Sequence, residues 1–180
     1  MMLEDLQIRP GIATDLPRLM AMDHSCASEY VWQLDFQKDA EQAAAVFRTV
    51  RLPREVNVPY PRRTDTLADL WPHQPGLVAV LPSGPVGYVR MLEQASAGTV
   101  WVTDWVVHPS LRRQGIGSRL VRAAQDWASE RGARRIILEM QSKNYPAICL
   151  AQSMGYDFCG YNDQYYATQD VTLFFGRALK

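Results

Sequence analysis

The turn that holds Arg112, Arg113, Gly115 and Gly117 carries the residues of this chain best suited to binding an anion. An apolar run precedes the turn, and an amphipathic pattern typical of a helix follows it. The first N–H groups of a helix have no partner inside the helix, and the helix dipole is positive at that end. Glycine adds no side chain that would keep a phosphate away from the backbone. The spacing therefore predicts a site for a phosphate or pyrophosphate, to which Arg119 adds charge.

Two common phosphate-binding loops do not fit this turn. A P-loop requires a lysine directly after its last glycine, and neither Gly115 nor Gly117 is followed by one. A dinucleotide-binding loop requires a third glycine, which is missing here. The remaining pattern, Arg112-x-x-Gly115-x-Gly117, resembles the acetyl-CoA pyrophosphate loop of the GCN5-related N-acetyltransferases, the GNAT family. A basic surface turn at the start of a helix is the alternative interpretation of so short a motif.

A second segment at the expected distance strengthens the resemblance. Residues 114–131 place apolar side chains at helical spacing, Gly132 ends that pattern, and residues 134–140 predict a strand. The positions that follow in the family's order and spacing are Asn144, Ala147, Leu150, Gly155 and Tyr156. The resemblance extends over residues 77–175, and on it the chain is identified as a member of the family.

The resemblance implies a mixed α/β fold with a mostly antiparallel sheet flanked by helices. Its central strands, residues 99–107 and 134–140, are expected to splay apart so that the pantetheine arm of acetyl-CoA inserts between them. Alternating apolar residues predict two further antiparallel pairs, formed by residues 77–81 with 86–92 and by residues 157–161 with 171–175.

The N-terminal part is less regular. We expect residues 1–180 to form a single domain, in which residues 30–71 are an insertion on the substrate side. Before the insertion, a strand over residues 6–9 and a helix that starts at Thr14 and Asp15 are expected. Within the insertion, the patterns predict a helix over residues 38–50, an extended segment over residues 51–60 and a helical turn over residues 65–71.

Composition restricts the partners. The chain has 19 basic and 19 acidic residues among its 180, so a nucleic acid partner is not expected. Its three cysteines do not have metal-ligand spacing, so no metal site is expected; they indicate reduced thiols and a cytoplasmic location. The chain has neither a secretory pattern nor a long apolar run, which argues against a membrane. A monomer and a dimer are both compatible with the sequence.

Two carboxylates are candidates for the base that takes a proton from an attacking amine. Glu139 lies in the predicted strand before Asn144 and, by resemblance to the ribosomal-protein N-terminal acetyltransferases, is the proposed base. Asp104 lies in the other central strand, where many family members carry an acidic residue. A carboxylate in an apolar strand is costly unless it is solvated or paired. For each residue the alternative is a strand carboxylate bonded to a backbone amide or to an arginine.

The sequence departs from the family at the general acid. The short helix of the family carries a tyrosine that protonates the CoA thiolate, and Ala151 stands at that position here. Tyr145, Cys149, Ser153 and water are the possible substitutes, and none is assigned.

The resemblance also implies which residues hold the cofactor. Val106 and Val107 are expected to offer backbone amides to the pantetheine arm and the thioester carbonyl. Asn144 is expected to orient the cofactor or a water, although capping of a helix is an equally physical role for it. The remaining expected cofactor-binding residues are Arg112, Arg113, Gln114, Gly115, Ile116, Gly117, Ser118 and Ala147.

The predicted function is transfer of an acetyl group from acetyl-CoA to a primary amine of a small molecule or peptide, by direct attack in a ternary complex. Aromatic and acidic residues in the insertion and in the closing strands would suit a cationic acceptor: Trp32, Asp35, Phe36, Tyr60, Trp71, Tyr161, Tyr165 and Tyr166. For any single aromatic residue among them, core packing is the favoured interpretation. The alternatives are a non-catalytic acyl-CoA sensor and a transferase for a longer acyl group, for which space near Ala151 would give room.

Overall fold

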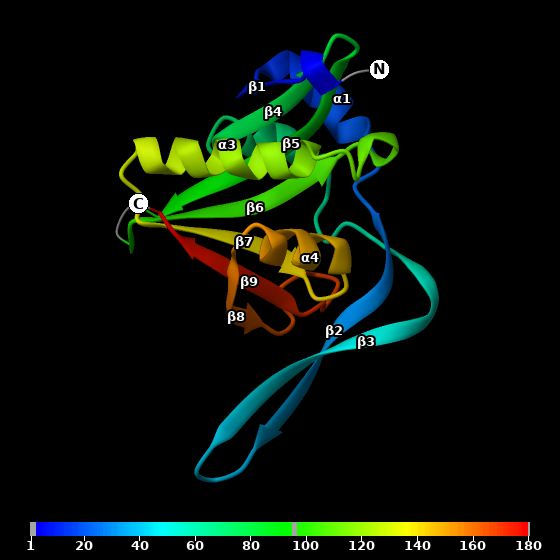
Figure 1. The fold of residues 1–180 in the computed structure, drawn as a ribbon, viewed down its shortest axis with the longest axis vertical. Helices are drawn as coiled ribbons and strands as arrows, with labels where there is room; N and C mark the ends of the chain where they lie inside the picture. Colours follow the sequence, from blue (N-terminus) through cyan, green and yellow to red (C-terminus); the bar gives the residue numbers. More distant parts are fainter. Residues whose placement is uncertain (1–2, 95–96, 180) are drawn as a thin grey trace.

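A computed structural model describes residues 3–94 and 97–179 of the chain. Its main sheet has seven strands in the order β1-β4-β5-β6-β7-β9-β8 (Figure 1). The bounds of these strands are Gln7–Pro10 (β1), Gly76–Leu81 (β4), Gly84–Gln94 (β5), Thr99–Val107 (β6), Arg135–Gln141 (β7), Asp157–Asn162 (β8) and Thr172–Ala178 (β9). Neighbouring strands are antiparallel, apart from the parallel pair β6 and β7. The mixed, mostly antiparallel sheet is therefore confirmed.

The two central strands separate part-way along their length. The parallel register joins Thr99 to Arg135 and ends where Val102 faces Leu138. Beyond that point β6 and β7 diverge, as Figure 1 shows, although β6 continues to Val107. The splay expected from the family resemblance is confirmed, and it begins immediately before Thr103 and Glu139, with Asp104 one residue further on.

Helices cover both faces of the sheet. The helix α3 (Ile116–Glu130) packs on one face through a buried stripe that includes Leu120, Val121 and Ala124. On the other face, α1 (Leu16–Ala21) and α2 (Leu67–Leu70) form a smaller core with Val78 and Tyr88. Sheet side chains alternate between these two cores, as the period of a strand requires. The other helical segments are α4 (Tyr145–Ser153) and the 3₁₀ turns Leu3–Asp5, Ala13–Asp15 and Pro109–Leu111.

The expected helix over residues 38–50 is wrong. The strands β2 (Cys26–Lys38) and β3 (Ala43–Val58) form an antiparallel hairpin that projects beyond the rest of the molecule (Figure 1), and we call it the arm. The β-branched and aromatic residues of the segment favour a strand once a partner strand is present. Pairing with β2 places Phe47 opposite Leu34, on the face that packs against Phe158. This tertiary pairing overrides the helical spacing of the segment.

Most of the other expected elements are present, including the helical turn at α2, the hairpin of β4 with β5 and the antiparallel pair of β8 with β9. Among the described residues, no helix has the length and apolar character needed to span a bilayer. Cys26, Cys149 and Cys159 are free thiols. The cytoplasmic location remains a prediction.

Candidate functional site

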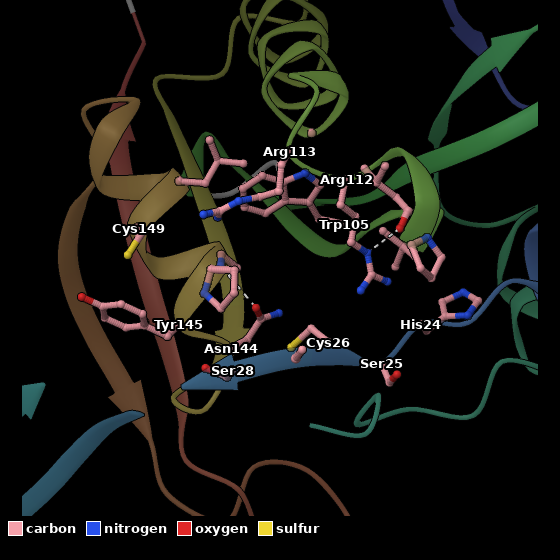
Figure 2. Close-up of a pocket in the computed structure, with 18 of the residues that line it drawn as sticks. His24, Ser25, Cys26, Ser28, Trp105, Arg112, Arg113, Asn144, Tyr145 and Cys149 are labelled. Atoms are coloured by element: carbon pink, nitrogen blue, oxygen red, sulfur yellow. Dashed lines mark hydrogen bonds between the residues drawn. The ribbon is translucent and has the colours of Figure 1, made fainter. Parts of the chain in front are cut away.

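A cavity of about 980 Å³ lies at the open end of the splay. Its walls come from the end of β6, the loop before α3 with the first turn of α3, the length of α4, and the beginning of β2 with the end of β3. Figure 2 shows Arg112 and Arg113 on one side of it, Tyr145 and Cys149 on α4, and Cys26 on β2. The expected cofactor-binding residues that line it are Val106, Val107, Arg112, Arg113, Gly115, Gly117, Ser118, Asn144 and Ala147.

The loop before α3 has a backbone that brings the start of the helix to the cavity. Arg113 and Gly115 have φ angles of 63° and 85°, so both lie in the left-handed region. Gly115 is the N-cap of α3. A Cβ at Gly117 would lie 3.3 Å from Nε1 of Trp105 and 3.4 Å from Cδ2 of Leu150. Glycine at position 117 therefore lets α3 begin close to β6 and α4, with its first N–H groups at the cavity wall.

The arginines of this loop differ in what they do. Arg112 donates from Nε to the carbonyl oxygen of Val107 at 2.8 Å and from Nη2 to that of Asp23 at 3.1 Å. It therefore ties the loop both to the end of β6 and to the segment before the arm. Arg113 lines the cavity, whereas Arg119 is not among its lining residues.

Two expected cofactor-binding residues do not line the cavity. The side chain of Ile116 is buried in the main core. The exposed Gln114 donates from Nε2 to the carbonyl oxygen of Ser110 at 3.3 Å. Their side chains are therefore not placed to contact the cofactor, and only their backbone groups could bind it.

Asn144 caps α4. Its side chain accepts a hydrogen bond from the backbone N–H of Ala147 at 3.2 Å, and Pro146 follows in the first turn. The capping role that the sequence left open is confirmed. Because Asn144 also lines the cavity, its role toward the cofactor remains a prediction.

The two candidate bases lie at the start of the splay, and neither lines the cavity. Both oxygens of Asp104 are occupied. Its Oδ2 accepts from Nε of Arg90 at 2.6 Å and from Oγ1 of Thr103 at 3.0 Å, and its Oδ1 accepts from Tyr60. The alternative of a carboxylate bonded to an arginine is therefore found for Asp104, and it is found for Glu139 as well, which bonds Arg62.

Arg62 bridges the two carboxylates across the diverging strands. Its Nη1 donates to the carbonyl oxygen of Thr103 at 2.8 Å and lies 3.4 Å from Oδ1 of Asp104, while Nη2 donates to Oε1 of Glu139. Tyr166 donates from Oη to the same Oε1 at 2.8 Å. Burial raises the pKa of Glu139 above its usual value, and the charge of Arg62 opposes that rise.

The candidate general acids for the CoA thiolate lie on the side of α4 that faces the cavity. Ala151 is fully buried in the main core and does not line the cavity, so the expected room for a longer acyl chain beside it is wrong. Tyr145, Cys149 and Ser153 all line the cavity. A hydrogen bond with Cys149, together with burial, raises the pKa of Tyr145, so its phenol keeps its proton at neutral pH.

A family model described as the acetyltransferase (GNAT) family matches residues 30–156. The chain belongs to the GNAT family. It is 38% identical over 90 residues to the streptothricin acetyltransferase of Streptomyces lavendulae, covering 49% of this chain and 48% of that protein. It is 37% identical over 75 residues to an aminoglycoside N(6')-acetyltransferase of Klebsiella aerogenes, covering 38% and 49%. The chain thus spans about half the length of these curated relatives.

Solved structures of the GNAT family share the fold over the whole chain. A nourseothricin acetyltransferase superimposes with a TM-score of 0.83 at 23% identity, covering 98% of this chain and 99% of that one. A candidate streptothricin acetyltransferase from Bacillus anthracis, solved in complex with acetyl coenzyme A, gives 0.74 at 20% identity and covers 97% and 99%.

Sequence reasoning missed several residues of the site in this GNAT chain. Arg62 lies 77 positions before Glu139, and nothing in its local sequence indicates that contact. Glu29 and Glu55 line the cavity from the beginning of β2 and the end of β3, and His24 lines it from the segment just before β2. A hairpin brings such ends together, so a correct prediction of the arm would have indicated their proximity.

The aromatic residues expected around an acceptor are divided between two places. Tyr60 and Tyr166 reach the carboxylates at the splay. Trp32 and Tyr161 instead pack in a cluster with Phe47. Of the remaining candidates, Trp71 packs edge-to-face with Tyr88 and Tyr165 contacts Phe174. Phe36 is exposed on the arm, and Asp35 pairs there with Arg48.

Proposed function

We propose that this chain transfers an acetyl group from acetyl-CoA to a primary amine of a small cationic molecule. The observation that carries the proposal is the continuity of one cavity from the start of α3 to the open end of the splay, beyond which two carboxylates lie. The end of the cavity at α3 suits a pyrophosphate, and the end at the splay suits acid–base chemistry.

The chain offers a fitting cradle for acetyl-CoA. The start of α3, with Gly115, Gly117 and Ser118 at the cavity wall, would bind the pyrophosphate through backbone N–H groups, and Arg113 would add charge. Val106 and Val107, on the part of β6 that has left β7, would bind the pantetheine arm through backbone groups.

Direct attack of the amine on the thioester carbonyl fits the state of Cys26. Cys26 lines the cavity, and burial raises its pKa to about 11, so it is a thiol rather than a thiolate at neutral pH. An acyl-enzyme on Cys26 is therefore disfavoured. In the proposed step the amine nitrogen bonds to the carbonyl carbon, the C–S bond breaks, and the amine loses a proton.

Glu139 is the better of the two proton acceptors. Both oxygens of Asp104 carry hydrogen bonds, whereas the bonds that Arg62 and Tyr166 donate to Glu139 share Oε1; Tyr165 also bonds this carboxylate. Its Oε2 would take the amine proton, through a water where the distance requires one. Tyr145, which keeps its proton and lines the cavity, would donate to the departing thiolate.

A small cationic acceptor is favoured by the relatives and by the cavity. Streptothricin and aminoglycoside acetyltransferases are among the relatives. Glu29 and Glu55 line the cavity and would attract a cation. A peptide N-terminus is the second candidate, because a [ribosomal protein bS18]-alanine N-acetyltransferase of Escherichia coli is 34% identical over 64 residues.

Thermal unfolding with acetyl-CoA and with free CoA tests the cofactor site. A ligand at 100 times its Kd adds about 2.7 kcal/mol of stability. Gly117→Glu, which brings a carboxylate to the start of α3, should abolish the shift, whereas Gly117→Ala should retain part of it. Absence of any shift in the wild type contradicts the proposal.

Release of CoA is then measured with streptothricin, an aminoglycoside and a bS18 N-terminal peptide. Faster release with streptothricin or the aminoglycoside supports the cationic small molecule. Release with the peptide alone favours the second candidate. Binding of acetyl-CoA without release in any of these assays favours the non-catalytic sensor.

A further inference from the structure

Residues 59–62, which we call the proline strap, connect the end of β3 to the turn before α2 and carry two side chains to the splay. Their sequence is Pro59-Tyr60-Pro61-Arg62. Tyr60 donates to Asp104, and Arg62 contacts Asp104 and Glu139. Each proline fixes its own φ and restricts the residue before it. Ordering the strap therefore costs little backbone conformational entropy, which favours a fixed position for Tyr60 and Arg62.

Arg62 occupies the place where the ladder between β6 and β7 stops. Val102 is the last residue of β6 in the parallel register, and the next carbonyl oxygen, that of Thr103, accepts from Nη1 of Arg62 at 2.8 Å. The other end of the guanidinium donates to Glu139 on β7. One planar fork thus satisfies groups on both diverging strands, which a lysine ammonium cannot do in the same geometry.

The buried charges at the splay form one network that runs from Arg90 through Asp104 and Arg62 to Glu139. Asp104 is held by Arg90, through both Nε and Nη2. Glu139 is left with Arg62 as its cationic partner, and the side chains of Glu139 and Asp104 are 1% and 0% exposed. The other groups that face Glu139 are Tyr166, Tyr165 and Asp104, which carry no positive charge. A buried carboxylate without a partner takes up a proton instead of staying charged.

We propose that Arg62 is a positioning residue for acetyl transfer, which holds Glu139 ionised and fixed at the start of the splay. The inference rests on the proposed function, in which Glu139 accepts the amine proton. During the step Arg62 keeps its own protons, Glu139 gains one, and that proton then passes to solvent. Arg62, like Glu139, is not a lining residue of the cavity, and the inference gives it a role through Glu139 without contact with acetyl-CoA.

The pH profile of kcat/KM separates this role from simple support of the fold. Arg62→Met should move the acidic limb, where Glu139 must lose its proton, upward by about one to three pH units, the usual effect of a close opposite charge. Arg62→Lys keeps the charge and should move the limb back toward the wild type. The Kd for acetyl-CoA should stay unchanged in both variants.

Arg63→Met is the matched control. Arg63 is the next residue in the chain, its side chain is 80% exposed, and it pairs with Asp65. This variant removes the same charge from the same loop and should leave the limb where it is.

A double-mutant cycle and a titration complete the test. If Arg62 acts through Glu139, Arg62→Met should cost far less in a Glu139→Gln background than in the wild type. Losses that are equal at every pH and multiply in the double variant would overturn the inference. Carbon-13 NMR of the Glu139 carboxyl follows the same titration without turnover.

The NMR titration also separates the two proposals. An unchanged Glu139 titration in folded Arg62→Met overturns the inference whether or not the wild type transfers acetyl groups. A raised titration in a protein that transfers to no amine leaves the pairing intact and contradicts the proposed function alone.

Discussion

Asp104 and Glu139 look alike in the sequence, since each is a carboxylate in an otherwise apolar strand. Their hydrogen-bond partners in the structure differ. Asp104 is surrounded by donors on both oxygens, including the two nitrogens of Arg90. Glu139 accepts from Arg62 and Tyr166 at Oε1, is also bonded by Tyr165, and lies at the start of the splay. The environment therefore suits Asp104 to holding β5 and β6 together and Glu139 to moving a proton.

Glu139→Gln should lower kcat by roughly 10²–10⁴-fold, the usual effect of losing a general base. The amide keeps the size of the side chain and can still accept from Arg62, so the fold should persist. Affinity for acetyl-CoA should not change, because Glu139 does not line the cavity. Steady-state kinetics with isothermal titration of acetyl-CoA checks both statements, and an unaltered kcat removes Glu139 from the mechanism.

Asp104→Asn should act on stability instead. The change leaves the buried Arg90 without its anionic partner, and breaking a buried ion pair from one side costs about 3–5 kcal/mol. Urea unfolding of this variant, beside that of Glu139→Gln, should show the larger loss for Asp104→Asn. The reverse order would contradict the division of roles.

At the scale of the elements, the sequence predicted best where the pattern was local. The strands β4 to β7 and helix α3 follow from alternation or helical spacing in single segments, and each lies within a few residues of its expected place. The loop at Gly115 and Gly117 was likewise readable, because its chemistry depends on adjacent residues. Residues 38–50 failed because Phe47 and its neighbours obtain their hydrogen bonds from β2. The place of Arg62 in the site was not predicted for the same reason, since its partners lie on strands that are distant in the sequence.

The cap of α4 provides a test of the two roles of Asn144. Asn144→Ala should lower the free energy of unfolding by about 1 kcal/mol, because the N–H of Ala147 loses its acceptor. Asn144→Asp can still cap and should regain that stability. If the residue serves only as a cap, both variants bind acetyl-CoA as the wild type does. Urea unfolding and a Kd measurement distinguish the outcomes.

The turn Ala13–Asp15 predicts a dependence of stability on pH. Asp15 accepts from both terminal nitrogens of Arg9, at 2.8 and 2.9 Å, and from the N–H of Ile12. The bond from Arg9 is the main cause of a pKa of Asp15 below its usual value of 3.8. A lowered folded pKa stabilises the fold above pH 3.8 and loses that effect as the pH falls through the folded pKa.

Asp15→Asn should therefore destabilise the chain by about 2 kcal/mol at pH 7, the scale of charged hydrogen bonds. The difference from the wild type should shrink below pH 4. Urea unfolding at several pH values measures it, with Asp65→Asn as the control, since Asp65 pairs with Arg63 in an exposed position. A gap that stays constant down to pH 2 would contradict the assignment.

At the scale of the whole molecule, the cavity is assembled from segments that are distant in the chain. Cys26 and Tyr30 come from the start of the arm, Ser25 directly precedes it, and Glu55 comes from its return strand. The opposite walls come from the loop before α3 and from α4. The aromatic cluster around Phe47 fixes the arm to β8 and β9, and the main-chain N–H of Trp32 donates to Ser142 at 3.0 Å.

Arg112 gives this assembly a thermodynamic consequence. One guanidinium holds the end of β6 and the carbonyl of Asp23, so any ligand that orders the loop also orders the chain that leads into the arm. Hydrogen exchange should therefore slow at residues 23–30 when acetyl-CoA binds, together with residues 112–118. If acetyl-CoA raises the affinity for an acceptor that binds against the arm, reciprocity requires that the acceptor raise the affinity for acetyl-CoA by the same factor. The two substrates would then bind with positive cooperativity, and the arm would couple the two binding sites.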